Sequence, residues 1–256
     1  MLQYERFEAI LNTLKQQPTV KVSDLSDTLG VSQSTIRRDI TDLDRAGKLQ
    51  KVFGGAVSVT SFEEGLSDTD GDAFSSRRIR EGLQVEEKSE VAAYAASLIK
   101  DGELIYIDAG TTTGSMIDRI RCYGATFVTN GVRHGLRLAE RGLRTYILSG
   151  YVKTSTEAIT GHDAVTNLQK YHFDRCFIGT DGVDSESGLT TADIEESMVK
   201  TEAIGRSSRV YVLADSSKFG KVASVKFAPL EAGTIITDKL PVPAMKDRTE
   251  IIELNK

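Results

Sequence analysis

The sequence predicts a small winged helix-turn-helix domain followed by a larger α/β domain with a mainly parallel sheet. Three observations lead to this fold class. Apolar residues recur at helical spacing before residue 59, short apolar runs alternate with helical segments after residue 103, and an acidic stretch poor in aliphatic residues lies between them. We therefore expect a first domain at 1–59, a linker at 60–84 and a second domain at 85–256.

The first domain is predicted to contain three helices. The first covers residues 4–16, where apolar side chains share one face, and Pro18 ends the pattern. In the second helix Ser23 stands where a residue can cap the helix, and Gly30 supplies the turn that follows. Its apolar positions fall three and four residues apart, at Val22, Leu25 and Leu29. Two short helices joined in this way form a helix-turn-helix.

The third helix has the polar face of a DNA-recognition helix. Ser32 can cap it, and its apolar stripe is Ile36, Ile40, Leu43 and Ala46, with Gly47 at its end. Polar side chains crowd its first turns, where Gln can pair with adenine and Arg with guanine or phosphate. The alternative interpretation is an ordinary helix hairpin with a solvated polar face.

Residues 47–56 predict a β-hairpin after this helix, with a Gly-Gly turn between two short strands. Such a hairpin is the wing of a winged helix, and its lysines are placed for phosphate contacts. The candidate DNA-binding residues are Ser32, Gln33, Ser34, Thr35, Arg37, Arg38, Arg45, Lys48 and Lys51.

The run STIRRDITDLDRAGKLQKVFGGA resembles the N-terminal signature of DeoR-type bacterial transcription regulators. Its TIRRD core is Thr35–Asp39, a leucine and a glycine follow at Leu43 and Gly47, and the strand ends in Gly54-Gly55-Ala56. The resemblance implies a domain that binds operator DNA.

Composition and charge fit a regulator without a membrane segment. The chain of 256 residues is 39% hydrophobic and has no apolar run of transmembrane length or signal peptide, so we expect a cytoplasmic protein that does not bind membranes. Cys122 and Cys176 are expected to be buried thiols. The net charge of −5 is uneven: residues 1–58 hold eight basic and seven acidic residues, and the acid excess lies in the remainder. An acidic body limits non-specific DNA binding.

The second domain is predicted to alternate strands and helices. A helix begins at residue 85, and further helices run to Ile120 and to Arg141. The predicted strands are 104–107, 126–129, 145–148, 176–178, 210–214 and 234–237, with 251–252 as an edge strand. This order indicates βαβ units and a mainly parallel sheet, in which ligands bind beyond the carboxyl ends of the strands.

Hydroxyl, amide, carboxylate and ammonium groups follow several of these strands. Together they favour a small phosphorylated polyol, because cations and amides can hold a phosphate and carboxylates can hold hydroxyls. For the run 108–113 alone, a capped βα turn is the alternative. The candidate ligand-binding residues are Asp108, Gly110, Thr111, Thr112, Thr113, Thr129, Asn130, Gly131, Gly150, Lys153, Asp181, Gly182, Glu195 and Lys218. The three histidines are too scattered for a metal site, and there is no GxGxxG motif, so we expect neither metal nor cofactor.

The second half also resembles DeoR-type regulators, whose sensor domain is similar in fold to ribose-5-phosphate isomerase and related CoA transferases. The segments that carry this resemblance are IDAGTTT (107–113), VTNG (128–131), FIGTDGVD (177–184), GLTTADIEESMVK (188–200) and VYVLADSSKFG (210–220). The resemblance implies a repressor of a sugar-utilisation operon and a homo-oligomer, dimer or tetramer, released from operator DNA by a sugar phosphate. Segments 129–150 and 151–161 are similar to members that respond to ketose phosphates such as fructose 1-phosphate or tagatose 6-phosphate.

Two alternatives remain at this point. An isomerase needs a positioned base and an oxyanion-stabilising group. The chain lacks the Lys-Gly-Gly-Gly loop of the isomerases after Asp184. We therefore expect a protein that is not an enzyme, with residual phosphosugar isomerase activity as the first alternative. A transcriptional activator is the second.

Overall fold

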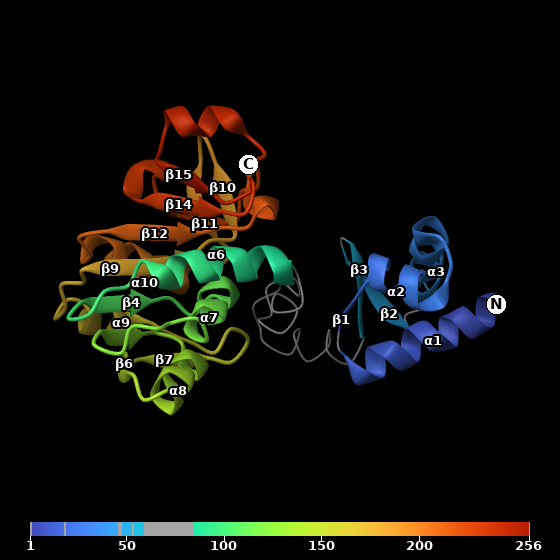
Figure 1. Ribbon diagram of the computed structural model, residues 1–256, viewed down its shortest axis with the longest axis horizontal. Helices are drawn as coiled ribbons and strands as arrows, with labels where there is room; N and C mark the ends of the chain where they lie inside the picture. Colours follow the sequence, from blue (N-terminus) through green and yellow to red (C-terminus); the bar gives the residue numbers. More distant parts are fainter. Residues whose placement is uncertain (1, 18, 46–47, 53, 59–83, 256) are drawn as a thin grey trace. The chain divides into compact units, whose positions relative to one another are not determined.

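The computed structural model describes residues 2–17, 19–45, 48–52, 54–58 and 84–255 (Figure 1). The chain divides into two compact units, Met1–Leu83 and Gln84–Lys256. The predicted linker at 60–84 lies outside the described residues except for its last position.

The first unit is a three-helix head with a small sheet. Its elements are α1 (Gln3–Gln16), β1 (Thr19–Lys21), α2 (Val22–Leu29), α3 (Gln33–Arg45), β2 (Leu49–Val52) and β3 (Gly55–Ser58). The three helices and the β2–β3 hairpin confirm the predicted winged helix-turn-helix. Apolar residues from all three helices form its core, among them Ile10, Leu25, Ile36, Ile40 and Leu43. Ala46 and Gly47 lie outside the described residues.

Strand β1 changes the start of the second helix. It was not predicted, and it pairs antiparallel with β3, so the wing sheet has the order β1-β3-β2. Because β1 runs directly into α2, Lys21 is the extended residue at the N-cap. The predicted cap at Ser23 is therefore wrong, and its hydroxyl donates to Asp24 Oδ1 at 2.8 Å. Gly30 has φ 63° and ends α2, as predicted.

The second unit is built on a seven-stranded sheet whose neighbouring strands are all parallel. In spatial order its strands are β15 (Ile251–Glu253), β14 (Thr234–Thr237), β12 (Val210–Leu213), β9 (Arg175–Gly179), β4 (Leu104–Ile107), β5 (Thr126–Thr129) and β6 (Arg144–Ile147). These are the seven strands that the sequence predicts, with ends that shift by one residue in β6, β9, β12 and β15. The predicted mainly parallel sheet is confirmed.

Helices cover both faces of this sheet. On one face lie α6 (Val85–Ser97), α7 (Thr111–Ile117) and α8 (Val132–Glu140), which pack on strand residues such as Ile105 and Ile107. On the other lie α9 (His162–Leu168) and α10 (Ile194–Gly205), which pack on strand residues such as Tyr106. Successive side chains point to opposite faces of a strand, so a central strand such as β4 (LIYI) is apolar on both faces. Helix α7 ends three residues before the predicted Ile120, and α8 ends one before Arg141.

Short strands outside the main sheet were not predicted. A hairpin is formed by β7 (Tyr151–Lys153) and β8 (Ala158–Thr160), and a second antiparallel sheet has the order β10-β11-β13. Its strands are β10 (Gly182–Asp184), β11 (Gly188–Thr191) and β13 (Val225–Ala228), and the 3-10 helices are η2 (Ser216–Lys218), η3 (Leu230–Ala232) and η4 (Pro243–Asp247). These strands contain lysine, aspartate, glycine or threonine in place of the continuous apolar runs that mark strands such as β4 and β12.

Replacing Gly55 should disrupt the wing. A Cβ on Gly55 would lie 2.0 Å from the carbonyl O of Val20, in the strand that pairs with β3. We expect Gly55→Ala to lower the free energy of unfolding of the head by more than about 1 kcal/mol. Thermal unfolding followed by circular dichroism measures this. Gly205→Ala is the control, because a Cβ there meets nothing within 4 Å. Equal melting of the two variants would contradict the β1–β3 packing.

Candidate functional site

The outward face of α3 presents polar and basic side chains to solvent. Gln33, Ser34, Arg37 and Arg38 are all exposed, whereas Ile36 on the opposite face is fully buried. Gln33 Oε1 accepts a hydrogen bond from Arg37 Nη2 at 3.1 Å, which holds that guanidinium along the helix. These four predicted residues therefore share one accessible surface.

Hydroxyl groups fix the start of the same helix. Ser32 Oγ accepts a hydrogen bond from the backbone N–H of Thr35 at 3.2 Å, so the predicted cap is confirmed. The Ser32 hydroxyl also lies 2.8 Å from that of Ser34 and 2.9 Å from that of Thr35. In the free protein these three hydroxyls order the first turn of α3.

The wing continues this surface. Lys51 on β2 donates from Nζ to Thr41 Oγ1 of α3 at 2.9 Å, and its backbone N–H donates to Asp44 Oδ1 at 2.8 Å. Lys48 is exposed at the start of the wing. The side chain of Arg45, also a candidate, lies outside what the structure describes. A helix face and a strand that share basic groups form a surface suited to a groove of DNA and its flanking phosphates.

A buried ion pair lies at the carboxyl edge of the central strands in the second unit. Lys200 Nζ on α10 lies 2.5 Å from Asp108 Oδ2, directly after β4, and also donates to the carbonyl O of Gly179 at 3.0 Å. The same Asp108 oxygen accepts from the backbone N–H of Gly179 at 3.1 Å. The two side chains are only 8% and 4% exposed. The pair therefore joins β4, β9 and α10 at one point.

Carboxylates outnumber the ammonium group at this point. Burial lowers the pKa of Lys200, but the charges of Asp108, Glu196 and Asp181 and the hydrogen bond to Asp108 outweigh it, so the pKa rises and Lys200 stays protonated at neutral pH. Asp181 Oδ2 accepts from Thr191 Oγ1 at 3.0 Å and from the Ala192 N–H at 3.2 Å. The excess of carboxylates supplies hydrogen-bond acceptors, the groups that sugar hydroxyls require.

Three of the predicted ligand residues hold the loops around this pair. Asn130 Oδ1 accepts from the Ala109 N–H at 3.0 Å, and its Nδ2 donates to the Ile159 carbonyl at 3.3 Å. The hydroxyl of Thr113 donates to the Asp108 carbonyl, and that of Thr129 donates to the Ile107 carbonyl. The structure thus assigns these three side chains bonds within the protein; ligand contact by them stays a prediction.

The predicted glycines stand where the backbone is crowded. A Cβ on Gly182 would lie 2.3 Å from the Lys221 carbonyl O, and one on Gly131 would lie 2.9 Å from the His134 ring. Gly110 is the N-cap of α7, followed by half-buried Thr111 and buried Thr112. Gly150 is exposed and has φ +144°, and a Cβ there would lie 2.6 Å from the Thr160 carbonyl O. Packing within the protein thus accounts for Gly131 and Gly182 without a ligand.

Two further candidates tie the β7–β8 hairpin to α10. Lys153 Nζ lies 2.9 Å from Asp193 Oδ2. Thr160 Oγ1 donates to Glu195 Oε2 at 2.8 Å. The hairpin is therefore fastened to the helix that carries Lys200.

Lys218 differs from Lys153, the other basic residue among the ligand-binding candidates. It ends the 3-10 helix η2, which Asp215 caps by accepting from the Ser217 N–H at 3.1 Å, and it is half-buried. Within the described part of the chain, its ammonium makes no hydrogen bond or ion pair. Lys218 is therefore available to an anionic ligand.

Lys200 was not predicted as a site residue, and Glu196 was not distinguished from Glu195. One signal could have identified both. Glu196 and Lys200 are four residues apart and Ala203 follows three later, so all three lie on one side of α10. A lysine on the same side as buried Ala203 indicates a buried partner for its charge.

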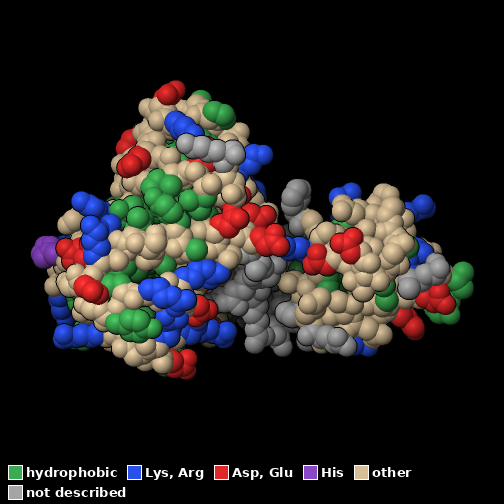
Figure 2. All heavy atoms as spheres, in the orientation of Figure 1, with side chains coloured by type: hydrophobic (Ala, Val, Ile, Leu, Met, Phe, Trp, Pro, Cys, Tyr) green, Lys and Arg blue, Asp and Glu red, His purple; other side chains and the backbone are tan. Residues whose placement is uncertain are grey.

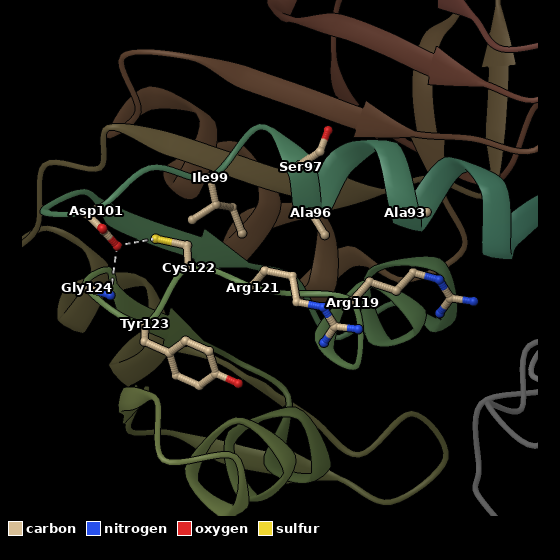
Figure 3. A pocket seen from close by; sticks show the side chains of 10 residues that line it. All are labelled: Ala93, Ala96, Ser97, Ile99, Asp101, Arg119, Arg121, Cys122, Tyr123 and Gly124. Carbon is tan, nitrogen blue, oxygen red and sulfur yellow. Dashed lines mark hydrogen bonds between the residues drawn. The ribbon is translucent and has the colours of Figure 1, made fainter.

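The pocket in Figure 3 lies near the amino-terminal ends of β4 and β5, opposite the strand ends that carry the Asp108–Lys200 pair. Its volume is about 600 Å³, and it is bordered by α6 and by residues 119–124, just before β5. Asp101 there accepts from Cys122 Sγ at 2.8 Å and from the Gly124 N–H at 2.9 Å, and Arg119 donates to Ser115 and Ser89. None of the predicted ligand residues lines it.

Cys122 is only half-buried, so its predicted burial is wrong, whereas Cys176 is buried.

Neither a metal cluster nor a membrane span is found in the described ranges. No group of three or more His, Cys, Asp or Glu side chains there could hold a metal ion. His134 is buried, and its Nε2 lies 3.0 Å from the Gly110 carbonyl O. Among the described helices, none has the length and apolar character needed to cross a membrane.

Known proteins resemble both units. The DeoR-like helix-turn-helix domain matches residues 6–62, and the DeoR C terminal sensor domain matches residues 83–239. The chain is 39% identical to the HTH-type transcriptional regulator FruR of Bacillus subtilis over 93% of this chain and 91% of that protein. It is 32% identical to the HTH-type transcriptional repressor GlcR of the same organism, over 96% and 93%. It is 30% identical to the lactose phosphotransferase system repressor of Staphylococcus epidermidis, over 93% of each.

Among solved structures, ribose 5-phosphate isomerase A of Methanocaldococcus jannaschii is similar over 52% of this chain and 53% of its own, with 20% identity and a TM-score of 0.38. At that level the likeness carries no functional argument. The relatives named above are regulators of transcription, not enzymes. The matches to both domains and along nearly the whole chain show that it belongs to the DeoR family of helix-turn-helix transcriptional regulators.

Proposed function

We propose that this regulator is a repressor of a sugar-utilisation operon whose hold on operator DNA is modulated by a phosphorylated sugar. Two relatives are named repressors, one of them of the lactose phosphotransferase system. The observation that carries the ligand class is the cluster of Asp108, Asp181 and Glu196 around buried Lys200, at the carboxyl ends of adjacent parallel strands.

The chemistry of this edge suits a phosphorylated polyol. Asp181 is half-buried and can accept hydrogen bonds from sugar hydroxyls. Lys218 supplies a cation for the phosphate, and the backbone amides at 110–113 supply donors. Ketose phosphates such as fructose 1-phosphate and tagatose 6-phosphate are the first compounds to test.

The effector acts through its different affinity for two states of the repressor. A sugar phosphate that binds the DNA-incompetent state more tightly lowers the affinity of the repressor for the operator. Operator DNA lowers the affinity for the sugar phosphate by the same factor. We propose this direction, release from DNA, so that the operon is expressed when the sugar phosphate accumulates.

DNA-binding anisotropy on the upstream region of the operon tests this function. At fixed salt, one sugar phosphate should weaken binding at least tenfold, and its unphosphorylated sugar should not. Salt is held constant because phosphate contacts make DNA affinity strongly dependent on it. Tight DNA binding that no sugar phosphate alters would refute the sensor. Deletion of the gene should raise operon expression; a fall would indicate an activator.

Lys218→Gln provides the residue-level control for that titration. Loss of the ammonium should weaken the response to the sugar phosphate by about tenfold or more and leave operator affinity unchanged. Lys170→Gln, at an exposed position after α9, is the matched variant that should respond like the wild type. Identical responses of the two variants would remove Lys218 from the site.

Replacing Arg38 should separate DNA binding from ligand binding. Arg38 is exposed on α3, and Arg38→Ala should reduce operator affinity by about 5- to 150-fold, as loss of one base or phosphate contact does. The thermal shift caused by the sugar phosphate should persist. Arg209→Ala, at an exposed arginine of the second unit, should bind DNA normally. Unchanged operator affinity of Arg38→Ala would exclude Arg38 from the interface.

A double-mutant cycle tests the buried ion pair. Lys200→Met leaves the Asp108 carboxylate without its cation and should lower the free energy of unfolding of the second unit by about 3–5 kcal/mol. Adding Asp108→Asn removes the stranded charge, so the double variant should lose less than the sum of the single variants. Urea unfolding followed by circular dichroism gives these values. Additive losses would show that the two side chains do not interact.

A further inference from the structure

The pocket between α6 and the segment 119–124 has no part in the proposed function. Small and apolar side chains form the wall on the side of α6, namely Ala93, Ala96 and Ile99, so space stays open beside the helix (Figure 3). The volume of about 600 Å³ lies within the range of small-molecule sites, roughly 300–1,000 Å³. The pocket can therefore hold a ligand of the size of a mononucleotide.

Two arginines on the opposite wall have no carboxylate partner among the described residues. Arg119 donates from Nη1 to the Ser115 carbonyl O at 2.6 Å and from Nη2 to the Ser89 hydroxyl, and both acceptors are neutral. Arg121 is exposed, and its guanidinium makes no hydrogen bond or ion pair within the described ranges. Arg119 is thus held in place with its charge unneutralised, and Arg121 is available to an anion.

Further positive charge lies beside the pocket. Arg141, directly after α8, donates to the backbone carbonyl groups of Asp118 and Ile120, next to Arg119 and Arg121. Figure 2 shows Lys and Arg side chains gathered in the part of the molecule where Figure 1 places α7 and α8. A concentration of guanidinium groups attracts anions to a hollow between them.

An aromatic ring and a carboxylate narrow the class of ligand. Figure 3 shows Cys122 turned toward Asp101, whereas Arg121 and Tyr123 are turned away from it. The Tyr123 side chain is 61% exposed, so its ring can stack on a planar base. Hydrogen bonds from Cys122 and from the Gly124 N–H lower the pKa of Asp101, so this carboxyl group is ionised at neutral pH. An ionised carboxylate accepts hydrogen bonds from hydroxyl groups.

We propose that this pocket binds a mononucleotide. The guanidinium groups of Arg119 and Arg121 hold its phosphate, because their planar donors match phosphate oxygens. The ring of Tyr123 stacks on the base, and Asp101 accepts hydrogen bonds from the ribose hydroxyls. A sugar phosphate without a base would leave the Tyr123 ring unused. The pocket lies opposite the strand ends of the proposed sugar phosphate site, so a nucleotide binds here independently of that site.

Isothermal titration calorimetry of the full-length protein tests this site, at fixed salt in a buffer without phosphate. The probes are AMP, GMP, CMP and UMP, and at least one should bind with a dissociation constant below about 1 mM. The corresponding nucleoside and inorganic phosphate should each bind at least tenfold more weakly. Arg121→Gln should raise the dissociation constant of the nucleotide at least tenfold, and Tyr123→Ala should raise it about 5- to 150-fold.

Matched variants outside the pocket serve as controls. Arg248→Gln and Tyr151→Ala alter side chains that are 51% and 65% exposed, and both should bind the nucleotide like the wild type. Lys218→Gln distinguishes the two sites. If nucleotide binding is lost in this variant and kept in Arg121→Gln, the nucleotide occupies the carboxyl edge of the sheet and the pocket site is refuted.

Three results would overturn the proposal: no binding of any of the four nucleotides, inorganic phosphate that binds as tightly as the nucleotide, or equal affinities of Arg121→Gln and Arg248→Gln. Thermal unfolding of each variant establishes that the fold is retained. If Arg121→Gln unfolds, Ala93→Glu replaces it, since this exposed position lines the pocket and an added carboxylate repels phosphate. Undiminished nucleotide affinity of that variant would equally overturn the site.

Discussion

The carboxyl edge of the second unit depends on the ion pair between Asp108 and Lys200. Each group would lose several kcal/mol by leaving water without a partner, so the fold is stable only when β4 and α10 bring the two together. The shared contact with Gly179 adds β9 to the same point. One charged contact therefore joins the three elements that line the proposed sugar phosphate site.

The same helix connects this site to the hairpin beside it. Asp193 and Glu195, at the start of α10, bind Lys153 and Thr160 of β7 and β8. A ligand that displaces α10 would act on the hairpin through these contacts. Direct contacts of this kind give an effector a physical route from the proposed site to the neighbouring hairpin.

Charge has different uses in the two units. On the head, Arg37 and Arg38 are displayed on α3, where DNA phosphates and bases can meet them. In the second unit several arginines pair with carboxylates within the chain, as Arg175 does with Glu103 at 2.7 Å. The excess of acidic residues outside the head leaves the recognition surface as the place where DNA is attracted.

The sequence by itself determined the family, the two domain classes, the recognition helix and the main strands, including 104–107, 126–129 and 234–237 with their observed ends. These follow from period, turn residues and motif, which are local properties of the chain. Tertiary structure alone decided which groups meet. Lys200 pairs with Asp108 across 92 positions, and β1 joins the wing only because β3 lies beside it. No local pattern encodes such pairings, because they arise when distant segments pack and a buried charge or strand edge must find its partner.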